Sequence, residues 1–309
     1  MKNPVGNFMH SLMHDRRHLA FAIFRRLSWL FPHDELYTKI YYRLDVNKKL
    51  NLSNPELFNE KLQWLKLYDH NIGYSDMADK YLVKSIVAAR IGSEYVAPVL
   101  GVWNDPRKID WDILPEKFVL KTNHDGGGNG IVVCKDKSKL KISQAKKILM
   151  RSWRRSSYRI AREWPYKNIK KVVFAEKFLE DSRYHELRDY KFFCFDGTPK
   201  LLYVASERGR QAKANFDFFD MDFNHLEITN GHSLSKQPIE KPESFDEMKR
   251  LASELSAGFP FIRVDFYEVD GHPYFGEYTF YHLGGTGTFH PDEWNKILGD
   301  WITLPSIIK

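Results

Sequence analysis

Two Asp-Gly pairs constrain the fold of this chain more than any other feature. Asp196-Gly197 and Asp270-Gly271 each stand between two short runs that are rich in β-branched and aromatic residues. Asp-Gly is a strong signal for the tight turn of a β-hairpin, so the flanking runs are expected to pair antiparallel. The runs that we predict as strands are 118–122, 131–134, 172–176, 190–195, 201–204, 261–267 and 273–278.

Ahead of residue 95 the pattern is helical instead, with apolar residues at helical spacing from residue 17 to about residue 92. One helix is expected to begin at Asn54 and Pro55, and another to run from Ser75 to Gly92. Three further helices are expected among the strands, at about 143–155, 245–257 and 291–300. Helices and antiparallel strands in separate stretches place the chain in the α+β class.

The composition is that of a soluble globular protein, with 43% hydrophobic and 28% charged residues in a chain of 309. This length suits two small domains or one domain built from lobes. Cys134 and Cys194 both lie in apolar runs, which predicts buried strand residues in a reducing compartment. No Cys or His spacing suggests a zinc site.

The N-terminal region contains an apolar run, residues 19–24, that is too short for a signal peptide or a membrane span. If residues 17–31 form a helix, most apolar side chains share one face, and two interpretations stay open. We favour a helix packed on the body of the protein. The alternative is peripheral contact with an anionic membrane surface. The expected location is the cytoplasm, with the inner face of the cell membrane as the second interpretation. The shared face consists of Ala20, Ile23, Phe24, Leu27, Leu30 and Phe31.

Positive charge is concentrated between Lys135 and Lys171. This segment has fourteen Lys or Arg against two acids, a surplus of twelve, whereas the whole chain carries +7. A solvated face explains this as well as a site for an anionic ligand does, such as nucleotide phosphates or an acidic sugar polymer. Nucleic acid is a less favoured partner, because the chain has no recognisable binding motif.

A glycine-rich run, Gly126 to Gly130, follows the strand that contains Lys121. Glycines let backbone N–H groups approach an anion closely, and a lysine adds a point charge for phosphate. The run is not a P-loop, because no Gly-Lys-Ser/Thr opens a helix. On its own it could equally be a flexible turn.

The second hairpin has chemically suggestive residues on both strands. Arg263 and Asp265 point to one face of the first strand, and Glu277 and Thr279 share a face of the second. A two-residue loop would pair Asp265 with residue 276 and put the carboxylates on opposite faces. A three-residue loop would bring Asp265 and Glu277 together, and this is the arrangement that a site requires. Two adjacent carboxylates suit Mg²⁺.

In order along the chain, the lysine, glycine loop, Glu-x-hydrophobic segment and Arg-x-Asp…Glu hairpin resemble ATP-grasp enzymes. They resemble more narrowly the TupA-like branch, which is associated with teichuronopeptide and other surface-polysaccharide synthesis. The resemblance covers about residues 58–300 and implies an ATP-grasp domain at 117–309 with a lid at about 117–175. A helical segment, 1–50, and a helical region, 51–116, would precede it. The stretches that carry the resemblance are 118–124, 162–170, 189–197 and 263–267.

The resemblance also implies roles for individual residues. Lysines and the glycine loop would hold the phosphates of ATP, and the segment at residue 176 would recognise adenine. Asp189 would contact the ribose, with Lys191 facing the same side, and Arg263 would steady the charge on a carboxyl substrate. Many ATP-grasp enzymes end the metal motif in Glu-x-Asn, whereas this chain has threonine at the last position. The implied cofactor-binding residues are Lys80, Lys121, Gly126, Gly127, Gly128, Gly130, Glu176, Lys177, Phe178, Leu179 and Asp189; the catalytic ones are Arg263 and Lys191; the metal ligands are Asp265, Glu277 and Thr279.

The implied activity is an ATP- and Mg²⁺-dependent ligase that joins a carboxylate to an amine through an acyl phosphate. Its partners would be an acidic, uronic-acid-type glycan or a small carboxylate, together with an amine or amino acid. Two alternatives stay open. Asp220-Met221-Asp222 is an Asp-x-Asp, a metal motif of nucleotide-sugar glycosyltransferases, and an ATP-grasp kinase would phosphorylate a hydroxyl instead. His124, His282 and His290 are interpreted as structural or substrate-lining.

Overall fold

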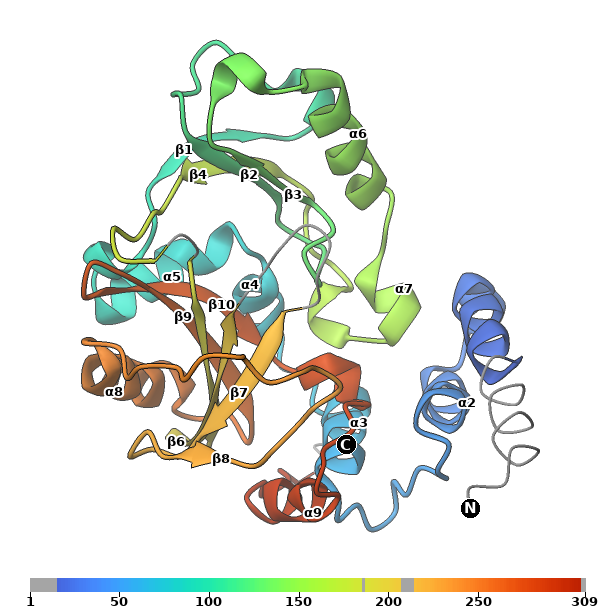
Figure 1. Ribbon diagram of the computed structural model, residues 1–309. Helices are drawn as coiled ribbons and strands as arrows, with labels where there is room; N and C mark the ends of the chain where they lie inside the picture. The colour runs from blue at the N-terminus through green and yellow to red at the C-terminus, as the bar shows by residue number, and fades with distance from the viewer. Residues whose placement is uncertain (1–15, 185–186, 207–213, 307–309) are drawn as a thin grey trace, which may run out of the picture.

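The computed structural model describes residues 16–184, 187–206 and 214–306, which form two antiparallel sheets with separate cores (Figure 1). Helices gather around the sheets rather than alternating with parallel strands, so the α+β prediction is confirmed. The helices, besides a helix at 16–26, are α2 (Asp34–Val46), α3 (Phe58–Tyr68), α4 (Tyr74–Ala78), α5 (Leu82–Ile91), α6 (Ile142–Trp153), α7 (Ser157–Ala161), α8 (Phe245–Ser256) and α9 (Glu293–Asp300).

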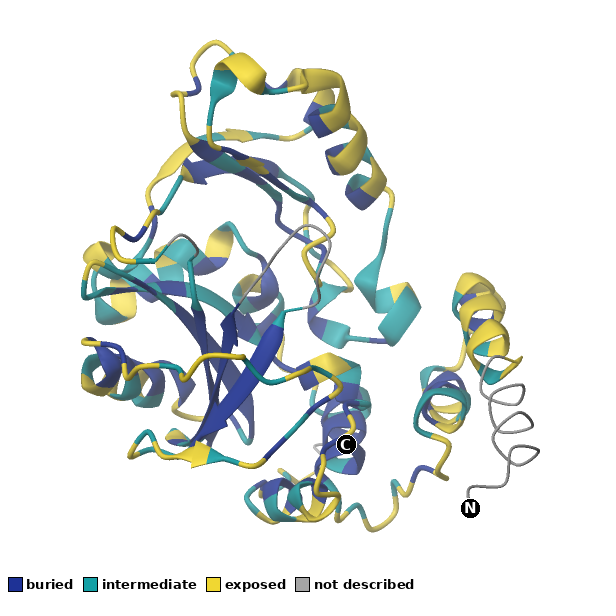
Figure 2. Cartoon of the chain, in the orientation of Figure 1, coloured by how far each residue is buried: buried dark blue, intermediate teal, exposed yellow. Residues whose placement is uncertain are grey.

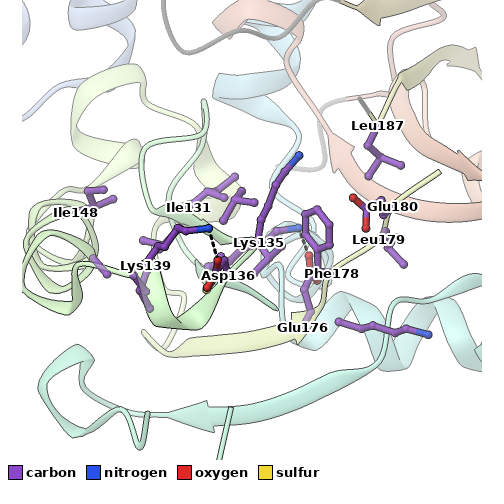
Figure 3. A pocket seen from close by; sticks show the side chains of 18 of the residues that line it. Ile131, Lys135, Asp136, Lys139, Ile148, Glu176, Phe178, Leu179, Glu180 and Leu187 are labelled. Atoms are coloured by element: carbon purple, nitrogen blue, oxygen red, sulfur yellow. Dashed lines mark ion pairs between the residues drawn. The ribbon is translucent and has the colours of Figure 1, made fainter. Parts of the chain in front are cut away.

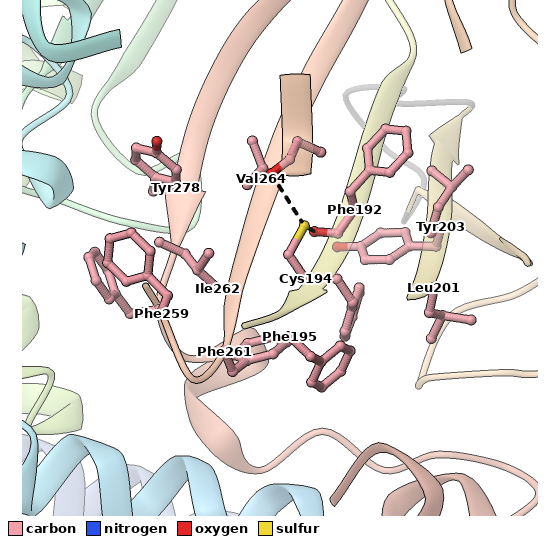
Figure 4. Packing of buried hydrophobic residues seen from close by; sticks show 14 of the residues in the cluster. Phe192, Cys194, Phe195, Leu201, Tyr203, Phe259, Phe261, Ile262, Val264 and Tyr278 are labelled. Atoms are coloured by element: carbon pink, nitrogen blue, oxygen red, sulfur yellow. Dashed lines mark hydrogen bonds between the residues drawn. The ribbon is translucent and has the colours of Figure 1, made fainter. Parts of the chain in front are cut away.

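The larger sheet has six strands in the order β10-β9-β5-β6-β7-β8. Neighbouring residues of its central strand point to opposite faces. Phe192 lies 6.0 Å from Phe245 of α8, and Phe193 lies 6.1 Å from Phe58 of α3, measured between ring centroids. Helices therefore cover both faces, and the inner strands are mostly buried (Figures 2 and 4). The strands are β5 (Asp189–Phe195), β6 (Thr198–Ser206), β7 (Asn215–Phe219), β8 (His225–Leu226), β9 (Ile262–Val269) and β10 (His272–Thr279).

The smaller sheet has the order β1-β4-β2-β3 and lies above the larger one in Figure 1. Phe118 and Leu120 of β2 are buried on the side of α6, so the alternate residues Val119 and Lys121 face the opposite way, into a cavity. The division of the chain at residues 50 and 116 stays a prediction. The strands are β1 (Val99–Trp103), β2 (Phe118–Thr122), β3 (Ile131–Cys134) and β4 (Val173–Lys177).

Most predicted strands and helices lie within three residues of the observed bounds, and β2 and β3 have the predicted bounds. The strand predictions did not include β1, β7 and β8. β1 is an edge strand interrupted by Gly101, and β7 ends directly before the Asp-x-Asp motif. Cys134 and Cys194 are buried strand residues, as predicted.

One helix start differs from the prediction. Asn54 and Pro55 lie outside any helix, and α3 begins at Phe58. The Glu60 carboxylate accepts a hydrogen bond at 3.2 Å from the backbone N–H of Leu57, just ahead of the helix. A glutamate three residues into a helix satisfies an N–H group that would otherwise lack a partner, so Glu60 fixes the start.

The helix predicted from Ser75 to Gly92 is in fact two helices, α4 and α5. Asp79 lies between them, and its Oδ1 accepts hydrogen bonds from the backbone N–H groups of Tyr81 and Leu82, at 2.8 and 3.0 Å. A side-chain acceptor at this position favours a new helix start over a continuous helix.

The N-terminal helices form a small unit beside α7 (blue in Figure 1). Phe24 stacks on Tyr37 of α2, with ring centroids 4.7 Å apart, so the helix at 16–26 packs on the protein through this residue. Ile23 and Leu30, which belong to the same predicted face, are exposed. None of the helices in the described ranges is long and apolar enough to cross a membrane.

The β9–β10 hairpin brings Asp265 opposite Glu277, but not through the three-residue loop that we expected. Val269 pairs with His272, so Asp270-Gly271 is a two-residue turn. The extra residue is instead Gly276, which forms a bulge on β10 and shifts the register by one residue. A Cβ at Gly276 would lie 3.1 Å from the Asp265 carbonyl oxygen, so glycine permits this close approach.

Candidate active site

A cavity of about 1090 Å³ lies between the smaller sheet and the larger one (Figure 3). Its walls come from β2, β3 and β4, from residues 135–148, and from the segment that follows β4. Tyr267 of β9 closes one side. The cavity brings together the predicted residues Lys121, Glu176, Lys177, Phe178 and Leu179.

Glu176 of β4 is shared by two largely buried lysines. Lys121 forms an ion pair with its Oε1, and Lys84 of α5 lies 2.9 Å from its Oε2. Burial alone would raise the pKa of Glu176, but the two ammonium groups outweigh burial and hold it below its ordinary value. The pKa of Lys121 is raised because Glu176 more than offsets burial, whereas burial lowers that of Lys84. Lys84 was not among the predicted site residues.

The segment after β4 leads from the smaller sheet to the larger one. The Lys177 backbone N–H donates to the Pro98 carbonyl oxygen at 2.9 Å, and the Phe178 ring lies 5.6 Å from the Lys135 ammonium. Farther on, Asp181 accepts a 2.8 Å hydrogen bond from the backbone N–H of Asp270, in the hairpin turn. The predicted adenine-recognition segment and the residues just after it are thus tied to both sheets, and we call residues 176–181 the hinge.

A second group of charged residues lies on three neighbouring strands of the larger sheet. Lys191 of β5 is opposite Asp265 of β9, which is opposite Glu277 of β10. Asp265 lies two residues before the cavity-lining Tyr267 and on the same face, so the cavity leads onto this group. The sheet therefore places predicted ATP-binding, catalytic and metal-binding residues side by side.

Asp265 is fully buried and saturated with cationic partners. Arg263 donates to both of its carboxylate oxygens, from Nε and Nη2 at 2.7 Å each, and Lys191 pairs with Oδ2. Lys191 also lies 2.9 Å from Asp189 Oδ2. Charge-assisted contacts of this kind offset the desolvation of all four groups.

The same surroundings shift other ionisation equilibria. Burial would raise the pKa of Glu277, but Lys80, Lys191 and Arg263 hold it far below its ordinary value. Burial would lower the pKa of Arg263 and Lys191, but Asp265 raises both. Glu277, Arg263 and Lys191 are therefore ionised at neutral pH.

His282 holds the other side of the Arg263 guanidinium. Its Nδ1 lies 3.0 Å from Arg263 Nη1, and its Nε2 lies 3.1 Å from Asn230 Oδ1. Burial and then the nearby cations lower the pKa of His282 well below its ordinary value, so the ring is neutral. A neutral ring with its proton on Nε2 accepts from Arg263 and donates to Asn230. His282 is thus structural, one of the two roles considered for it, and it touches a predicted catalytic residue.

The carboxylate oxygens of Asp265 and Glu277 are chemically suitable ligands for Mg²⁺. Mg²⁺ takes oxygen ligands and is commonly held by one or two carboxylates together with substrate phosphates and water. Glu277 Oε1 is 3.8 Å from the nearest Arg263 nitrogen, which leaves it less engaged than the oxygens of Asp265. Thr279 pairs with Arg263 in the register, and its metal role stays a prediction. Across the described residues no three His, Cys, Asp or Glu side chains form a metal cluster.

The model of the TupA-like ATP-grasp family matches residues 60–303, which is most of the chain. The chain belongs to the TupA-like ATP-grasp family. This match confirms both the predicted family and the predicted fold. ATP and Mg²⁺, the predicted cofactors, are those with which ATP-grasp ligases work.

No curated protein matches the chain. Solved structures with a similar fold include D-alanine–D-alanine ligase from Bacillus anthracis, 17% identical with a TM-score of 0.39, covering 71% of this chain and 58% of that one. The same enzyme from Helicobacter pylori is 14% identical, with a TM-score of 0.41 and coverage of 74% and 61%. The D-cycloserine synthetase DcsG is 15% identical, with a TM-score of 0.41 and coverage of 73% and 69%. The chain spans less than two thirds of both D-alanine–D-alanine ligases, and the family match carries the assignment.

In this TupA-like protein Lys80 reaches the group around Asp265 from the break between α4 and α5. Its ammonium lies 2.5 Å from Glu277 Oε2. Asn123, just beyond β2, fixes that break, because its Nδ2 donates to Asp79 Oδ2 at 2.6 Å and its carbonyl accepts from the Lys80 backbone N–H at 3.1 Å. Lys80 and Lys121 therefore approach the site from two different elements.

The glycine loop between β2 and β3 combines open and crowded positions. Gly127 and Gly128 have positive φ, of 64° and 74°, and a Cβ on Gly126 or Gly128 would meet nothing within 4 Å. A Cβ on Gly130 would lie 2.0 Å from Thr122 Oγ1, so this position requires glycine for packing. The phosphate-binding role of the loop stays a prediction.

A further charged pair was missed because its members lie almost a hundred residues apart. The ammonium of Lys66 on α3 is fully buried and donates to the Gly284 carbonyl at 2.7 Å. Burial lowers the pKa of Lys66 to about 8, although nearby Glu163 acts in the opposite direction, and burial raises the pKa of Glu163. The positive charge of Lys80 also acts to lower the pKa of Glu163.

The Asp-x-Asp motif forms a turn. Asp220 Oδ1 accepts hydrogen bonds from the backbone N–H groups of Asp222 and Asn224, at 2.9 and 2.8 Å, in the connection from β7 to β8. Neither aspartate lines the cavity.

His124 is buried on the side of Trp153, with its pKa lowered to about 4 by burial, and the His290 backbone pairs with Thr229.

Proposed function

We propose that this protein is an ATP- and Mg²⁺-dependent ligase that joins a carboxylate to an amine through an acyl phosphate. One observation carries the proposal. The cavity lined by Lys121, Glu176 and the hinge leads along β9 to Asp265, Arg263 and Glu277. This juxtaposition suits a nucleotide whose terminal phosphate meets an acid-bound metal and a fixed guanidinium.

Nucleotide binding would proceed by exchange of ion-pair partners. Lys121 now pairs with Glu176, and Lys80 with Glu277, so each lysine would turn from a carboxylate to a phosphate oxygen. Lys84 would stay on Glu176 during this exchange and keep the buried carboxylate compensated. The backbone of Lys177 to Leu179 would receive the adenine ring, and Asp189 the ribose.

Transfer of the phosphoryl group would place most of the developing charge near Arg263. A carboxylate oxygen of the substrate would attack the γ-phosphorus, and ADP would leave with the bonding electrons. Asp265 and Glu277 would hold Mg²⁺, which supplies charge neutralisation on the phosphates when bound. An amine would then attack the acyl carbon, losing a proton as phosphate departs. Arg263, fixed by Asp265 and His282, would be preorganised for the negative charge in both steps.

We place the reaction in the modification of bacterial surface polysaccharide, at the cytoplasmic face of the membrane. Exposed Lys141, Lys147, Arg151 and Arg154 on or beside α6 give the outer surface of the smaller sheet a positive potential. That charge suits an acidic, uronic-acid-type glycan as the carboxylate substrate, with an amine or amino acid as the second. The proposal rests here on charge and on the family.

The test is an ADP-release screen in the presence of Mg²⁺ that pairs amino acids with uronic-acid glycans and small carboxylates. We expect ADP, phosphate and an amide to appear together for one class of pair. A phosphoester with ADP would show a kinase instead. Absence of ADP from every pair, together with no measurable ATP binding, would contradict the proposal.

A further inference from the structure

Residues 19–36 contain a dense group of exposed, large apolar side chains. Leu19 and Ile23 are 62% and 51% exposed, and Leu27 follows at the same four-residue spacing, so the three share one side of the N-terminal helix. Leu30 and Trp29 of η1 (Ser28–Leu30) extend the exposed surface. We call Leu19, Ile23, Leu27, Trp29 and Leu30 the apolar stripe.

The stripe is a defined surface, because the same helix is held firmly by its other side. Phe24 is buried against Tyr37, and the Phe21 ring lies 4.8 Å from the Tyr41 ring of α2, measured between centroids. The stripe therefore faces away from the core of its own unit.

The charge of the segment that contains the stripe is basic. Residues 16–33 include Arg16, Arg17, Arg25 and Arg26 and no Asp or Glu, and Asp34 and Glu35 follow in the first turn of α2. Arg16 and Arg26 are exposed, whereas Arg25 lies against the Phe21 ring. An apolar stripe with a tryptophan and arginines beside it is complementary to the headgroup region of a bilayer that contains anionic lipid.

We infer that the apolar stripe docks this protein on an anionic membrane surface. The N-terminal helix would lie in the interface plane, with leucine and isoleucine side chains among the acyl chains and the arginines at the headgroups. This inference concerns a surface and does not depend on the proposed ligase activity.

The contacts between the N-terminal unit and α7 would give the docked protein a fixed orientation. Arg162 Nε lies 3.0 Å from Asp34 Oδ1, and Tyr158 donates to Asp34 Oδ2 at 2.6 Å. The Tyr37 hydroxyl donates to the Ile160 carbonyl at 2.7 Å. Because residues 157–162 precede Glu163 and the hinge, these contacts would hold the cavity at a set height above the bilayer.

Co-sedimentation of the full chain with vesicles tests the inference. We expect binding to vesicles of phosphatidylcholine with phosphatidylglycerol, weak binding to phosphatidylcholine alone, and loss of binding at high salt. The double substitution Leu19→Glu and Ile23→Glu should lower the affinity on the order of a hundredfold or more. Arg16→Gln with Arg26→Gln should lower it mainly for the anionic vesicles. Ile72→Glu, at an 85% exposed residue elsewhere, is the matched control and should bind like the original chain.

Three outcomes would overturn the inference. The original chain could fail to bind either vesicle. The double glutamate variant could bind undiminished, which would assign lipid contact to another part of the chain, such as residues 1–15. Sedimentation without lipid could show a dimer that the double variant abolishes, with no lipid binding by either protein, and the stripe would then contact a second copy.

Discussion

Glu176 compensates two largely buried lysines at once, and this sharing allows one of them to change partner. An isolated buried carboxylate or ammonium would be costly, so release of Lys121 toward a phosphate requires that Glu176 keep a second cation. Lys84 is placed to do this, at 2.9 Å from the other carboxylate oxygen. Glu277 is arranged similarly, with Lys80 in contact and Arg263 at 3.8 Å. Each predicted phosphate ligand is thus paired with an acid that has another cation nearby.

Substitution of Glu176 tests this interpretation. Glu176→Gln leaves the ammonium groups of Lys84 and Lys121, whose side chains are 12% and 15% exposed, without this counter-charge, so we expect the free energy of unfolding to fall by about 3 kcal/mol in urea titrations. Glu180→Gln removes a comparable ion pair with Lys117 that is exposed to solvent, and should change little. Equal effects of the two substitutions would contradict the shared-counter-ion interpretation.

The lowered pKa values of Glu176 and Glu277 predict a specific pH dependence. A carboxylate whose pKa is lower in the folded than in the unfolded chain contributes stability above the unfolded value of about 4.3, and loses it as pH falls through the folded value. We therefore expect the free energy of unfolding to decrease below about pH 4. The slope of this decrease should be smaller in Glu277→Gln, measured by urea titration at several pH values. An unchanged slope in that variant would mean that Glu277 titrates normally in the folded protein.

At the scale of elements, the β9–β10 hairpin shows which features of a fold can be predicted from local sequence patterns. The alternation of side chains and the Asp-Gly turn were predictable from short stretches, and both were correct. The loop length was wrong, because a two-residue turn and a bulge at Gly276 produce the same register between Asp265 and Glu277 as a three-residue loop. A bulge depends on close approach between strands. A glycine allows this approach, but a glycine in the sequence does not by itself predict a bulge.

The bulge should be sensitive to a side chain. A Cβ on Gly276 would meet the Asp265 carbonyl at 3.1 Å and the Tyr267 ring at 3.2 Å. We expect Gly276→Val to destabilise the protein by about 1–3 kcal/mol and to reduce ADP release, because Glu277 would move relative to Asp265. Gly126→Ala, where a Cβ meets nothing within 4 Å, is the control for stability in the same thermal and urea measurements. A Gly276→Val protein with full stability and activity would show that the bulge does not set the carboxylate pair.

At the scale of the whole molecule, the site is assembled from segments that no local pattern relates. Lys84 contacts Glu176, His282 contacts Arg263, and Asn230 contacts His282, yet the three come from α5, η6 (His282–Gly285) and a connecting loop. The resemblance to the family located the residues on the strands, because the family's motifs follow one another in the same order along this sequence. The supporting residues depend on how the two sheets and the helical region pack, and that arrangement appears only in three dimensions.

Binding of ATP between the two sheets should stabilise the entire molecule, and metal should be required for it. A ligand at about a hundred times its Kd adds about 2.7 kcal/mol to the free energy of unfolding, a shift of several degrees in Tm. We expect this shift for ATP with Mg²⁺ in differential scanning fluorimetry. With EDTA in place of Mg²⁺ the shift should shrink strongly, because Asp265 and Glu277 would face the triphosphate without an intervening cation.

Two variants separate the metal effect from a general loss of ATP binding. Glu277→Gln removes one carboxylate, so ATP should stabilise it almost equally with and without Mg²⁺. Asp220→Asn changes only the turn between β7 and β8, and should keep the full dependence on Mg²⁺. If Asp220→Asn lost that dependence while Glu277→Gln kept it, the metal would bind at the Asp-x-Asp turn, and the nucleotide-sugar transferase would become the better hypothesis.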